Sequence, residues 1–278
     1  MQQRRFGSST REVSIVGQGT WKIDESKRAA AVDALRRGID DGMTHIDTAE
    51  MYGDAELVIA EALKGQRRDA LFLVSKVLPQ NASRTGVVTA CERSLKRLGT
   101  DYLDCYLLHW PGRHPLAATI EGFEDLVRAG KIRTWGVSNF DVDDLNEALT
   151  IAGPGRIACN QVLYHLRERS IEHAVMPWCE RHDVAVVAYT PFGPGAFPSV
   201  NTPGGRLLAE IATAHDATPR QVVLAWLARR SFVIPKASSA THAAENAGAG
   251  DLELSADEAK HIDEAFPRGA KPRGLPML

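Results

Sequence analysis

Short apolar runs alternate with longer amphipathic segments along almost the whole chain, and this alternation limits the possible folds more than any other feature. The short runs have the length of buried strands, and the longer segments repeat apolar residues at helical spacing. Strands that alternate with helices build βα units around a parallel sheet. We expect strands at residues 17–21, 45–47, 71–76, 102–108, 134–137, 158–161, 184–189 and 232–234.

The number of strand–helix units points to a barrel. Eight units fit within 278 residues without a low-complexity linker, so we predict one α/β domain over residues 1–278, a TIM (β/α)8 barrel. Residues 13–16 are typical of half of an N-terminal β-hairpin cap, and residues 267–278 of an ordered or half-ordered tail. Asp141 is the expected N-cap of its helix. The expected helices are residues 27–41, 55–64, 84–98, 119–129, 141–149, 171–181, 207–214 and 218–230, with C-terminal helices at 241–248 and 257–266.

The charge balance and the cysteines count against several classes of protein. The formal net charge of -2 argues against nucleic acid or an anionic membrane as the main partner. No apolar run is long enough to act as a secretory signal or to span a bilayer, so we expect a cytoplasmic protein. The cysteines lie far apart and without a nearby histidine at metal-ligand spacing, so we expect reduced thiols and no metal site at Cys91, Cys105, Cys159 and Cys179.

Polar residues follow three consecutive expected strands, namely Asp47, Tyr52, Lys76 and His109. A parallel barrel gathers the C-terminal ends of its strands on one face, where barrel enzymes hold their active sites. Tyrosine is a weak acid with an ordinary pKa of about 10, and an ammonium such as that of Lys76 would lower this pKa. Asp47 could hold Lys76 as an ion pair, and His109 could hydrogen-bond a substrate oxygen. Such a site protonates a carbonyl oxygen, and a reduced nicotinamide is implied because no side chain donates hydride.

Each of these residues also has an ordinary structural interpretation. A rim aromatic, a solvated loop lysine, a helix cap and a packed core histidine would account for Tyr52, Lys76, Asp47 and His109 taken singly. A Schiff-base lyase would use Lys76 as nucleophile, but it needs a lysine of lowered pKa, and Asp47 would act against that. A metal hydrolase on the same barrel would need clustered ligands that the sequence does not offer. The placement of all four residues after barrel strands favours a site that reduces a carbonyl over these alternatives.

Several short motifs stand in order along the chain: residues 17–21 (GQGTW), 45–53 (HIDTAEMYG), 75–76 (SK), 108–111 (LHWP), 130–140 (GKIRTWGVSNF), 160–165 (NQVLYH), 234–238 (IPKAS) and 245–246 (EN). Together they resemble the aldo-keto reductase family, prokaryotic type, over nearly the whole chain. The resemblance implies reduction of aldehydes and reactive ketones to alcohols with a reduced nicotinamide cofactor.

The resemblance also implies a role for each matching residue. Tyr52 would be the general acid, Lys76 and Asp47 the pair that lowers its pKa, and His109 the residue that orients the substrate. Nicotinamide binding is implied for Ser138, Asn139 and Gln161, and ring stacking for Tyr189. Further cofactor contacts are implied for Thr20 and Trp21 and, around the pyrophosphate, for Thr190, Pro191, Phe192 and Gly193.

The adenosine end of the cofactor is implied after the last strand. Lys236, Ala237, Ser238 and Ser239 would face the 2′-phosphate, and Glu245 and Asn246 the adenine, although Glu245 could equally belong to a helix surface. The family usually has an arginine where this chain has His242, and often a serine where it has Ala237. Because histidine lacks the permanent charge of a guanidinium, we expect NADPH as cofactor and some use of NADH.

The expected partner is a small-molecule carbonyl substrate, and the expected oligomeric state is a monomer. Apolar side chains should form the substrate pocket, namely Trp21, Met51, Trp110 and Phe140. Residues 192–205 are rich in glycine and proline and could close over the cofactor as a clasp. The alternative is a regulatory subunit that binds NADPH and senses redox state without catalysis. It is less favoured because the chain retains all the expected catalytic residues.

Overall fold

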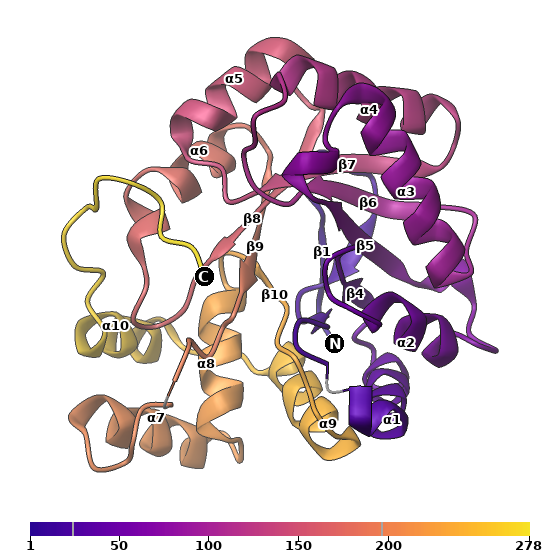
Figure 1. Cartoon of the computed structure of the whole chain (residues 1–278). Coiled ribbons are helices and arrows are strands. Elements are labelled where there is room, and N and C mark those ends of the chain that lie inside the picture. Colours follow the sequence, from indigo (N-terminus) through magenta and orange to yellow (C-terminus); the bar gives the residue numbers. More distant parts are fainter. Residues whose placement is uncertain (24, 196) are drawn as a thin grey trace.

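A parallel sheet forms the centre of the molecule (Figure 1). The computed structural model describes residues 1–23, 25–195 and 197–278. Within these ranges eight strands pair side by side in chain order, which confirms the predicted barrel architecture. The strands are β3 (Gln18–Gly19), β4 (His45–Asp47), β5 (Phe72–Val77), β6 (Leu103–Leu108), β7 (Ile132–Ser138), β8 (Ile157–Leu163), β9 (Ala185–Tyr189) and β10 (Phe232–Val233).

Backbone hydrogen bonds join the two ends of this sheet. The Gly17 amide donates to the Val233 carbonyl at 2.8 Å, and the Val233 amide donates to the Ile15 carbonyl at 2.9 Å. One residue pair further on, a Cβ atom on Gly19 would lie 2.5 Å from the carbonyl oxygen of Ile234. Only glycine fits this close approach of two backbones, so Gly19 allows β3 to meet the segment after β10.

Helices surround the sheet in Figure 1, most of them placed between successive strands. Their ends match the predicted ranges to within a few residues, and several of them begin with a side-chain cap. Asp141 caps α5 as predicted, in a capping box with Asp144. The helices are α1 (Arg28–Asp40), α2 (Ala55–Ala62), α3 (Arg84–Leu98), α4 (Leu116–Arg128), α5 (Val142–Ala152), α6 (Val175–Arg181), α7 (Pro203–Ala214), α8 (Pro219–Ala228), α9 (Ala240–Gly248) and α10 (Ala256–Ala265).

The single helix predicted over residues 171–181 is wrong. A 3-10 turn, η4 (Ser170–His173), comes first, and α6 begins only after Ala174 has left helical geometry with φ at -148°. Buried polar groups explain the break. Glu172 on this turn accepts hydrogen bonds from Tyr164 at 2.8 Å and from Arg169 at 2.7 Å, and these contacts hold the turn in place.

An N-terminal hairpin closes one end of the barrel, as the sequence predicts. Its strands are β1 (Gln3–Arg5) and β2 (Glu12–Ser14), paired antiparallel. Phe6, in the turn, is fully buried, with ring centroids 4.6 Å from Phe72 and 4.9 Å from Phe232. The hairpin therefore seals the end of the barrel that lies opposite the C-terminal ends of the strands.

The C-terminal segment after α10 forms no helix or strand among the described residues. It turns back over the barrel, so that its end lies close to β8 and β9 (Figure 1). Among the described helices, none combines the length and the apolar character needed to cross a membrane.

Candidate active site

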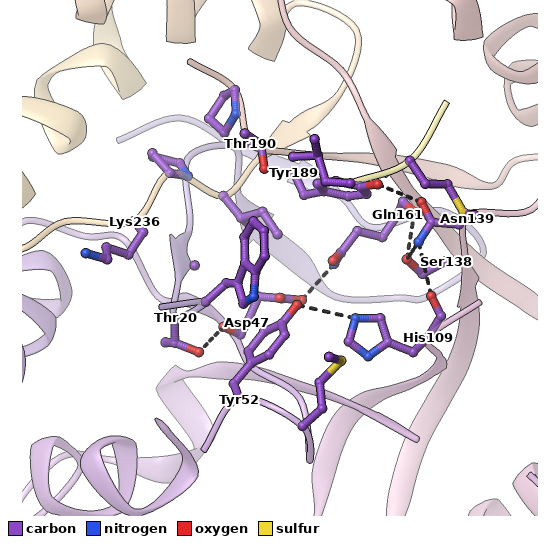
Figure 2. Close-up of a pocket in the computed structure, with 18 of the residues that line it drawn as sticks. Thr20, Asp47, Tyr52, His109, Ser138, Asn139, Gln161, Tyr189, Thr190 and Lys236 are labelled. Atoms are coloured by element: carbon purple, nitrogen blue, oxygen red, sulfur yellow. Dashed lines mark hydrogen bonds between the residues drawn. The ribbon is translucent and has the colours of Figure 1, made fainter. Parts of the chain in front are cut away.

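A cavity of about 450 Å³ opens at the C-terminal ends of the strands (Figure 2). Asp47 ends β4, Tyr52 lies in the loop before α2, and His109 directly follows β6. All three line this cavity, and Lys76 of β5 lies beneath it as a fully buried side chain. The structure thus brings together the four residues that the sequence singled out.

Asp47 and Lys76 form a buried ion pair. The Lys76 Nζ lies 2.5 Å from Asp47 Oδ1 and also donates to the Thr48 carbonyl at 2.8 Å. Burial acts to lower the pKa of Lys76, but its contacts with Asp47 and Tyr52 more than offset this, and the pKa is raised. Lys76 is therefore held as an ammonium.

Tyr52 lies against both this ammonium and an imidazole. Its hydroxyl is 3.4 Å from His109 Nε2, and the Lys76 Nζ is 5.0 Å from the centre of its ring. Burial raises the pKa of Tyr52, and the charge of Lys76 opposes this without reversing it. The sequence predicted a lowered pKa, and that direction is wrong because it left out desolvation. The phenol is accordingly kept protonated, as a proton donor must be.

His109 is neutral. Burial, followed by the charge of Lys76, lowers its pKa to about 2. In the described part of the chain its Nδ1 has no hydrogen-bond partner, and Nε2 is the ring nitrogen that lies beside Tyr52. A neutral imidazole in this position can donate one hydrogen bond to a substrate oxygen.

Amide and hydroxyl groups form a connected row on the next strands of the barrel. Tyr189 donates from its hydroxyl to Asn139 Oδ1 at 2.8 Å, and Asn139 Nδ2 donates to the His109 carbonyl at 3.1 Å. Ser138 Oγ donates to the Gln161 carbonyl at 2.9 Å. Each of these side chains lines the cavity. The row therefore presents the face of one aromatic ring and several fixed hydrogen-bonding groups to a bound molecule.

Two residues of this cavity have strained backbones. Asn139 has φ of 60° and Thr190 has φ of 53°, a left-handed conformation that is rare for residues other than glycine and unfavourable for β-branched threonine. Hydrogen bonds hold both in place, from the Asn139 amide to the Gln161 carbonyl at 2.8 Å and from the Gly193 amide to the Thr190 carbonyl at 2.8 Å. Strain of this kind gathers at functional sites.

Most of the remaining predicted site residues also line the cavity. Trp21 and Met51 are 38% and 45% exposed and stand at its mouth. Thr20 Oγ1 donates to the backbone carbonyl of Asp47 at 2.9 Å, so it also supports the end of β4. The other predicted residues on the cavity wall are Trp110, Thr190, Pro191, Phe192, Gly193 and Lys236.

Phe140 does not form part of the pocket, so that prediction is wrong. It is 1% exposed and packs into the hydrophobic core. Asn160 explains its position, because its side-chain amide donates to the Phe140 carbonyl at 2.9 Å and its Oδ1 accepts from the Phe140 amide at 3.4 Å. These two bonds fix the backbone immediately after Asn139 and direct the phenylalanine ring inward.

The residues predicted for the adenosine end lie beyond Lys236, outside the cavity itself. Lys236 is exposed, and its Nζ donates to Ser238 Oγ at 2.9 Å. Ser239 caps α9 by accepting from the His242 amide, and His242 is exposed on the first turn. Glu245 accepts a hydrogen bond from Thr218 Oγ1 at 2.8 Å. Of the two remaining residues predicted for the adenosine end, Asn246 is buried and Ala237 is half-buried.

Some residues of the cavity wall were missed by sequence reasoning. Met277 and Leu278 line it from the C-terminal tail, and Gly19, Ile234 and Pro235 line it from the closing seam of the barrel. The seam residues lie within motifs that the sequence displays. The tail carries no periodic pattern that could have signalled its return to the site.

The segment predicted to form a clasp contributes one wall and an aromatic cluster. Phe192 lines the cavity, and its ring centroid is 6.0 Å from that of Phe197. The guanidinium of Arg220 lies 4.8 Å from both ring centroids. Ala196, which also belongs to the predicted clasp, lies outside the described residues.

An α/β barrel with a protonated phenol, a buried lysine–aspartate pair and a neutral imidazole at the C-terminal ends of its strands is an arrangement suited to carbonyl reduction. Comparison with known proteins agrees. Residues 15–266 match the family model described as "Aldo/keto reductase family". Among the described residues, no group of three or more histidine, cysteine or acidic side chains is placed to hold a metal ion.

Relatives and solved structures match over most or all of the chain. Methylglyoxal reductase YeaE of Escherichia coli (strain K12) is 44% identical over 286 residues, with 100% of both chains covered. Glyoxal reductase of Bacillus subtilis (strain 168) is 34% identical, with 91% of this chain and 88% of the relative covered. An aldo/keto reductase from Klebsiella pneumoniae, crystallised with NADP and acetate, is 44% identical, with a TM-score of 0.91 and coverage of 100% and 99%. The chain belongs to the aldo/keto reductase family, which confirms the resemblance and the class of enzyme.

Proposed function

We propose that this protein reduces small reactive aldehydes and ketones, dicarbonyls such as methylglyoxal among them, with NADPH as the preferred cofactor. The observation that carries the proposal is the protonated Tyr52 phenol, 3.4 Å from neutral His109 and beside the Lys76–Asp47 ion pair on the cavity floor. Proton donation to an oxygen that gains negative charge is the chemistry this arrangement serves best.

The residues around the cavity suit a nicotinamide nucleotide. Tyr189 offers an aromatic face, and burial raises its pKa to about 12, so its hydroxyl stays a donor to Asn139. Gln161 uses its amide nitrogen on Asp47, which leaves its amide oxygen available to a carboxamide. Lys236 and Ser238 form an exposed ammonium–hydroxyl pair that suits a phosphate. The NADP and NADPH found in crystals of related reductases support this choice.

When bound, the reduced nicotinamide supplies the hydride. The protein supplies the proton, and Tyr52 releases it to the carbonyl oxygen as negative charge grows there. The phenolate that remains lies beside the Lys76 ammonium, which Asp47 keeps charged and in place. Neutral His109 orients the same oxygen by donating a hydrogen bond from Nε2. Each group thus acts at one stated atom.

The walls of the cavity define the class of substrate. Trp21, Trp110 and Met51 are apolar, and the cavity of about 450 Å³ has to hold the nicotinamide end of the cofactor as well. A small carbonyl compound fits the remaining space better than a bulky one. The names of the relatives, a methylglyoxal reductase and a glyoxal reductase, support the same class of substrate.

The alternatives are less well supported. A Schiff base at Lys76 needs a neutral amine, whereas contact with Asp47 at 2.5 Å keeps the lysine protonated. A redox-sensing subunit that only binds cofactor has no use for a phenol held protonated beside an imidazole. Either role would leave the relation between Tyr52 and His109 without a purpose.

Oxidation of NADPH, followed by absorbance with purified protein, tests the proposal. Methylglyoxal, glyoxal and an aromatic aldehyde are offered in turn, and NADH is compared at the same concentrations. We expect turnover with the small dicarbonyls and a higher kcat/KM with NADPH. NADPH binding without turnover of any carbonyl would contradict the proposal and favour the redox-sensing role.

A further inference from the structure

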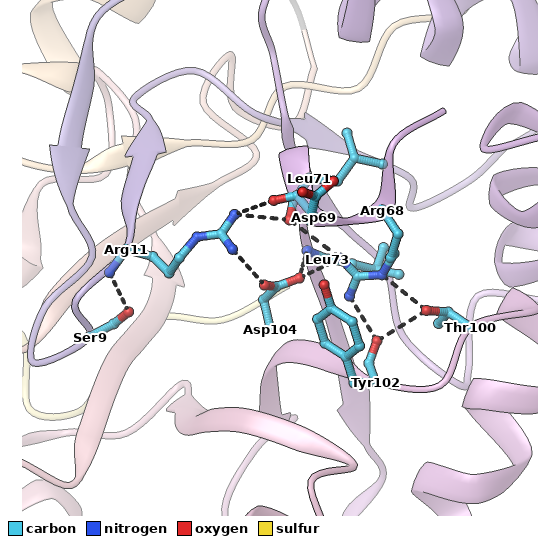
Figure 3. A network of polar contacts seen from close by, with 9 residues as sticks. All are labelled: Ser9, Arg11, Arg68, Asp69, Leu71, Leu73, Thr100, Tyr102 and Asp104. Carbon is cyan, nitrogen blue, oxygen red and sulfur yellow. Dashed lines mark hydrogen bonds and ion pairs between the residues drawn. The ribbon is translucent and has the colours of Figure 1, made fainter. Parts of the chain in front are cut away.

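A second cavity, of about 430 Å³, lies at the opposite end of the barrel from the candidate active site. The turn of the N-terminal hairpin forms one side of it, with Ser8, Ser9, Thr10 and Arg11. The beginnings of β7 and β8 form the other side, through residues such as Arg133, Thr134 and Arg156. Figure 3 shows the polar network on its floor, centred on Asp104. The proposed carbonyl reduction uses none of these residues.

Arg133 is the residue of this cavity that most suggests a bound anion. It belongs to the segment 130–140 that the sequence analysis singled out, yet it lies at the end of β7 opposite Ser138. Its guanidinium packs 4.2 Å from the ring centre of Tyr102, and it makes no ion pair within the described ranges. Arg68 packs 4.0 Å from the same ring. Arg68 is paired with the Asp104 carboxylate, so Arg133 is the cation on this ring that has no carboxylate partner among the described residues.

Asp104 pairs with Arg68, but only one of its two oxygens is hydrogen-bonded among the described residues. Its Oδ2 lies 2.8 Å from Arg68 Nη1 and accepts from the Leu73 amide at 2.9 Å, so that oxygen is satisfied. Its Oδ1 is buried and has no hydrogen-bond partner in the part of the chain that the structure describes. The Nη1 of Arg11 forms an ion pair with this oxygen at 3.8 Å, which is too long for a hydrogen bond, while its Nη2 donates to the Asp69 carbonyl at 3.1 Å (Figure 3).

The unpaired guanidinium of Arg133 and the Asp104 oxygen without a hydrogen bond set two requirements for a ligand. Arg11 and Arg133 offer positive charge to a negatively charged group. A carboxylate oxygen only accepts hydrogen bonds, so Asp104 Oδ1 needs a donor. The hydroxyls of Thr10 and Thr134 make no side-chain hydrogen bond among the described residues and can serve either need. A ligand that satisfies all of them carries negative charge and its own O–H group.

We propose that this cavity binds hydrogen phosphate. Near neutral pH inorganic phosphate keeps at least one O–H, which can donate to Asp104 Oδ1, while its other oxygens accept from Arg133 and Arg11. Sulfate has a similar shape and charge but carries no proton at that pH, so it would face the buried carboxylate oxygen without a donor. The bound ion would connect the hairpin turn to the beginnings of β7 and β8.

Isothermal titration of the whole chain, saturated with NADP⁺, tests this site. The nucleotide fills the region of Lys236, which would otherwise attract phosphate too. At neutral pH and matched ionic strength we expect one phosphate to bind per chain, and sulfate to bind about tenfold more weakly or not at all. No binding of phosphate, or equal binding of sulfate, would overturn the proposal.

Variants locate the site. Arg133→Gln removes the unpaired cation from an exposed position and should weaken phosphate binding by about tenfold or more. Arg229→Gln removes another exposed arginine, one that does not line the cavity, and this variant should bind phosphate as the parent does. Asp104→Asn turns the acceptor into a potential donor, so the preference for phosphate over sulfate should shrink or reverse. Unchanged binding by Arg133→Gln, or an unchanged preference in Asp104→Asn, would contradict the assignment.

Discussion

Gln161 donates a hydrogen bond from Nε2 to Oδ2 of Asp47 at 2.7 Å. The bond crosses the barrel from β8 to β4 and joins residues that stand 114 positions apart in the sequence. It occupies the carboxylate oxygen that Lys76 leaves free, since Lys76 contacts Oδ1. A residue predicted only to bind the nicotinamide therefore also holds the carboxylate that anchors the lysine beside Tyr52.

We expect Gln161→Leu to lower kcat as well as cofactor affinity. The substitution leaves Asp47 Oδ2 buried without a donor, so the pKa of Asp47, which burial already raises, should rise further. The ammonium of Lys76 would then be less firmly held, and kcat should fall by about tenfold or more. Steady-state kinetics at saturating NADPH separate the two effects. If KM for NADPH rises while kcat is unchanged, the contact with Asp47 has no catalytic consequence.

We expect Lys76→Met to destabilise the protein by about 3–5 kcal/mol, because it leaves the Asp47 carboxylate buried and unpaired. Adding Asp47→Asn to it should restore much of this stability. Arg230→Met is a matched control, since its ion pair with Glu180 is about half exposed and should contribute less than about 1 kcal/mol. Urea unfolding measures all three variants. Equal losses of unfolding free energy in Lys76→Met and Arg230→Met would show that the buried ion pair matters no more to stability than the exposed one.

The neutrality of His109 predicts the dependence of activity on pH. Its pKa of about 2 lies far below the ordinary value of 6.5, so the folded enzyme keeps the imidazole neutral throughout the range in which a free histidine gains its proton. Tyr52, with a raised pKa, stays protonated on the alkaline side. We therefore expect kcat/KM for the carbonyl substrate to be nearly constant from about pH 5 to pH 8. Arg133→Gln, at the opposite end of the barrel, is the control and should show the same pH profile as the parent. A loss of activity that follows a pKa near 6.5 would contradict a neutral His109.

The choice between NADPH and NADH should follow the charge beyond Lys236. Lys236→Ala removes an exposed ammonium bonded to Ser238, so KM for NADPH should rise by about tenfold while KM for NADH changes little. His242→Arg adds a permanent charge on the first turn of α9 and should shift the ratio of kcat/KM values toward NADPH. Comparing both cofactors with each variant is the measurement. Parallel changes with the two cofactors would place the 2′-phosphate elsewhere.

The sequence predicted those parts of the fold and the site that depend on local pattern. His45–Asp47 and α3 were predicted to the residue, and for α3 the signal is the helical spacing of its apolar residues. Other features depend on contacts between distant segments. The break before α6 comes from the buried Glu172, and the inward position of Phe140 from Asn160. The return of Met277 to the cavity has no local signal at all.

The direction of the pKa shift at Tyr52 also depends on contacts that the sequence does not show. From the sequence, a neighbouring lysine is the only visible influence on the phenol, and it lowers the pKa. In the folded chain the loss of water around the phenol outweighs that charge. Burial depends on the packing of the whole barrel, which no motif around Tyr52 encodes.

Proton donation by Tyr52 is the central claim, and Tyr52→Phe tests it most directly. The substitution removes the hydroxyl that lies 3.4 Å from His109 and keeps the ring against Lys76. With methylglyoxal as substrate, we predict that kcat falls by about a thousandfold while the dissociation constant of NADPH, measured by fluorescence, stays within about twofold of the parent. Turnover close to that of the parent would contradict the claim, and so would a loss of NADPH binding that accounts for the lost activity.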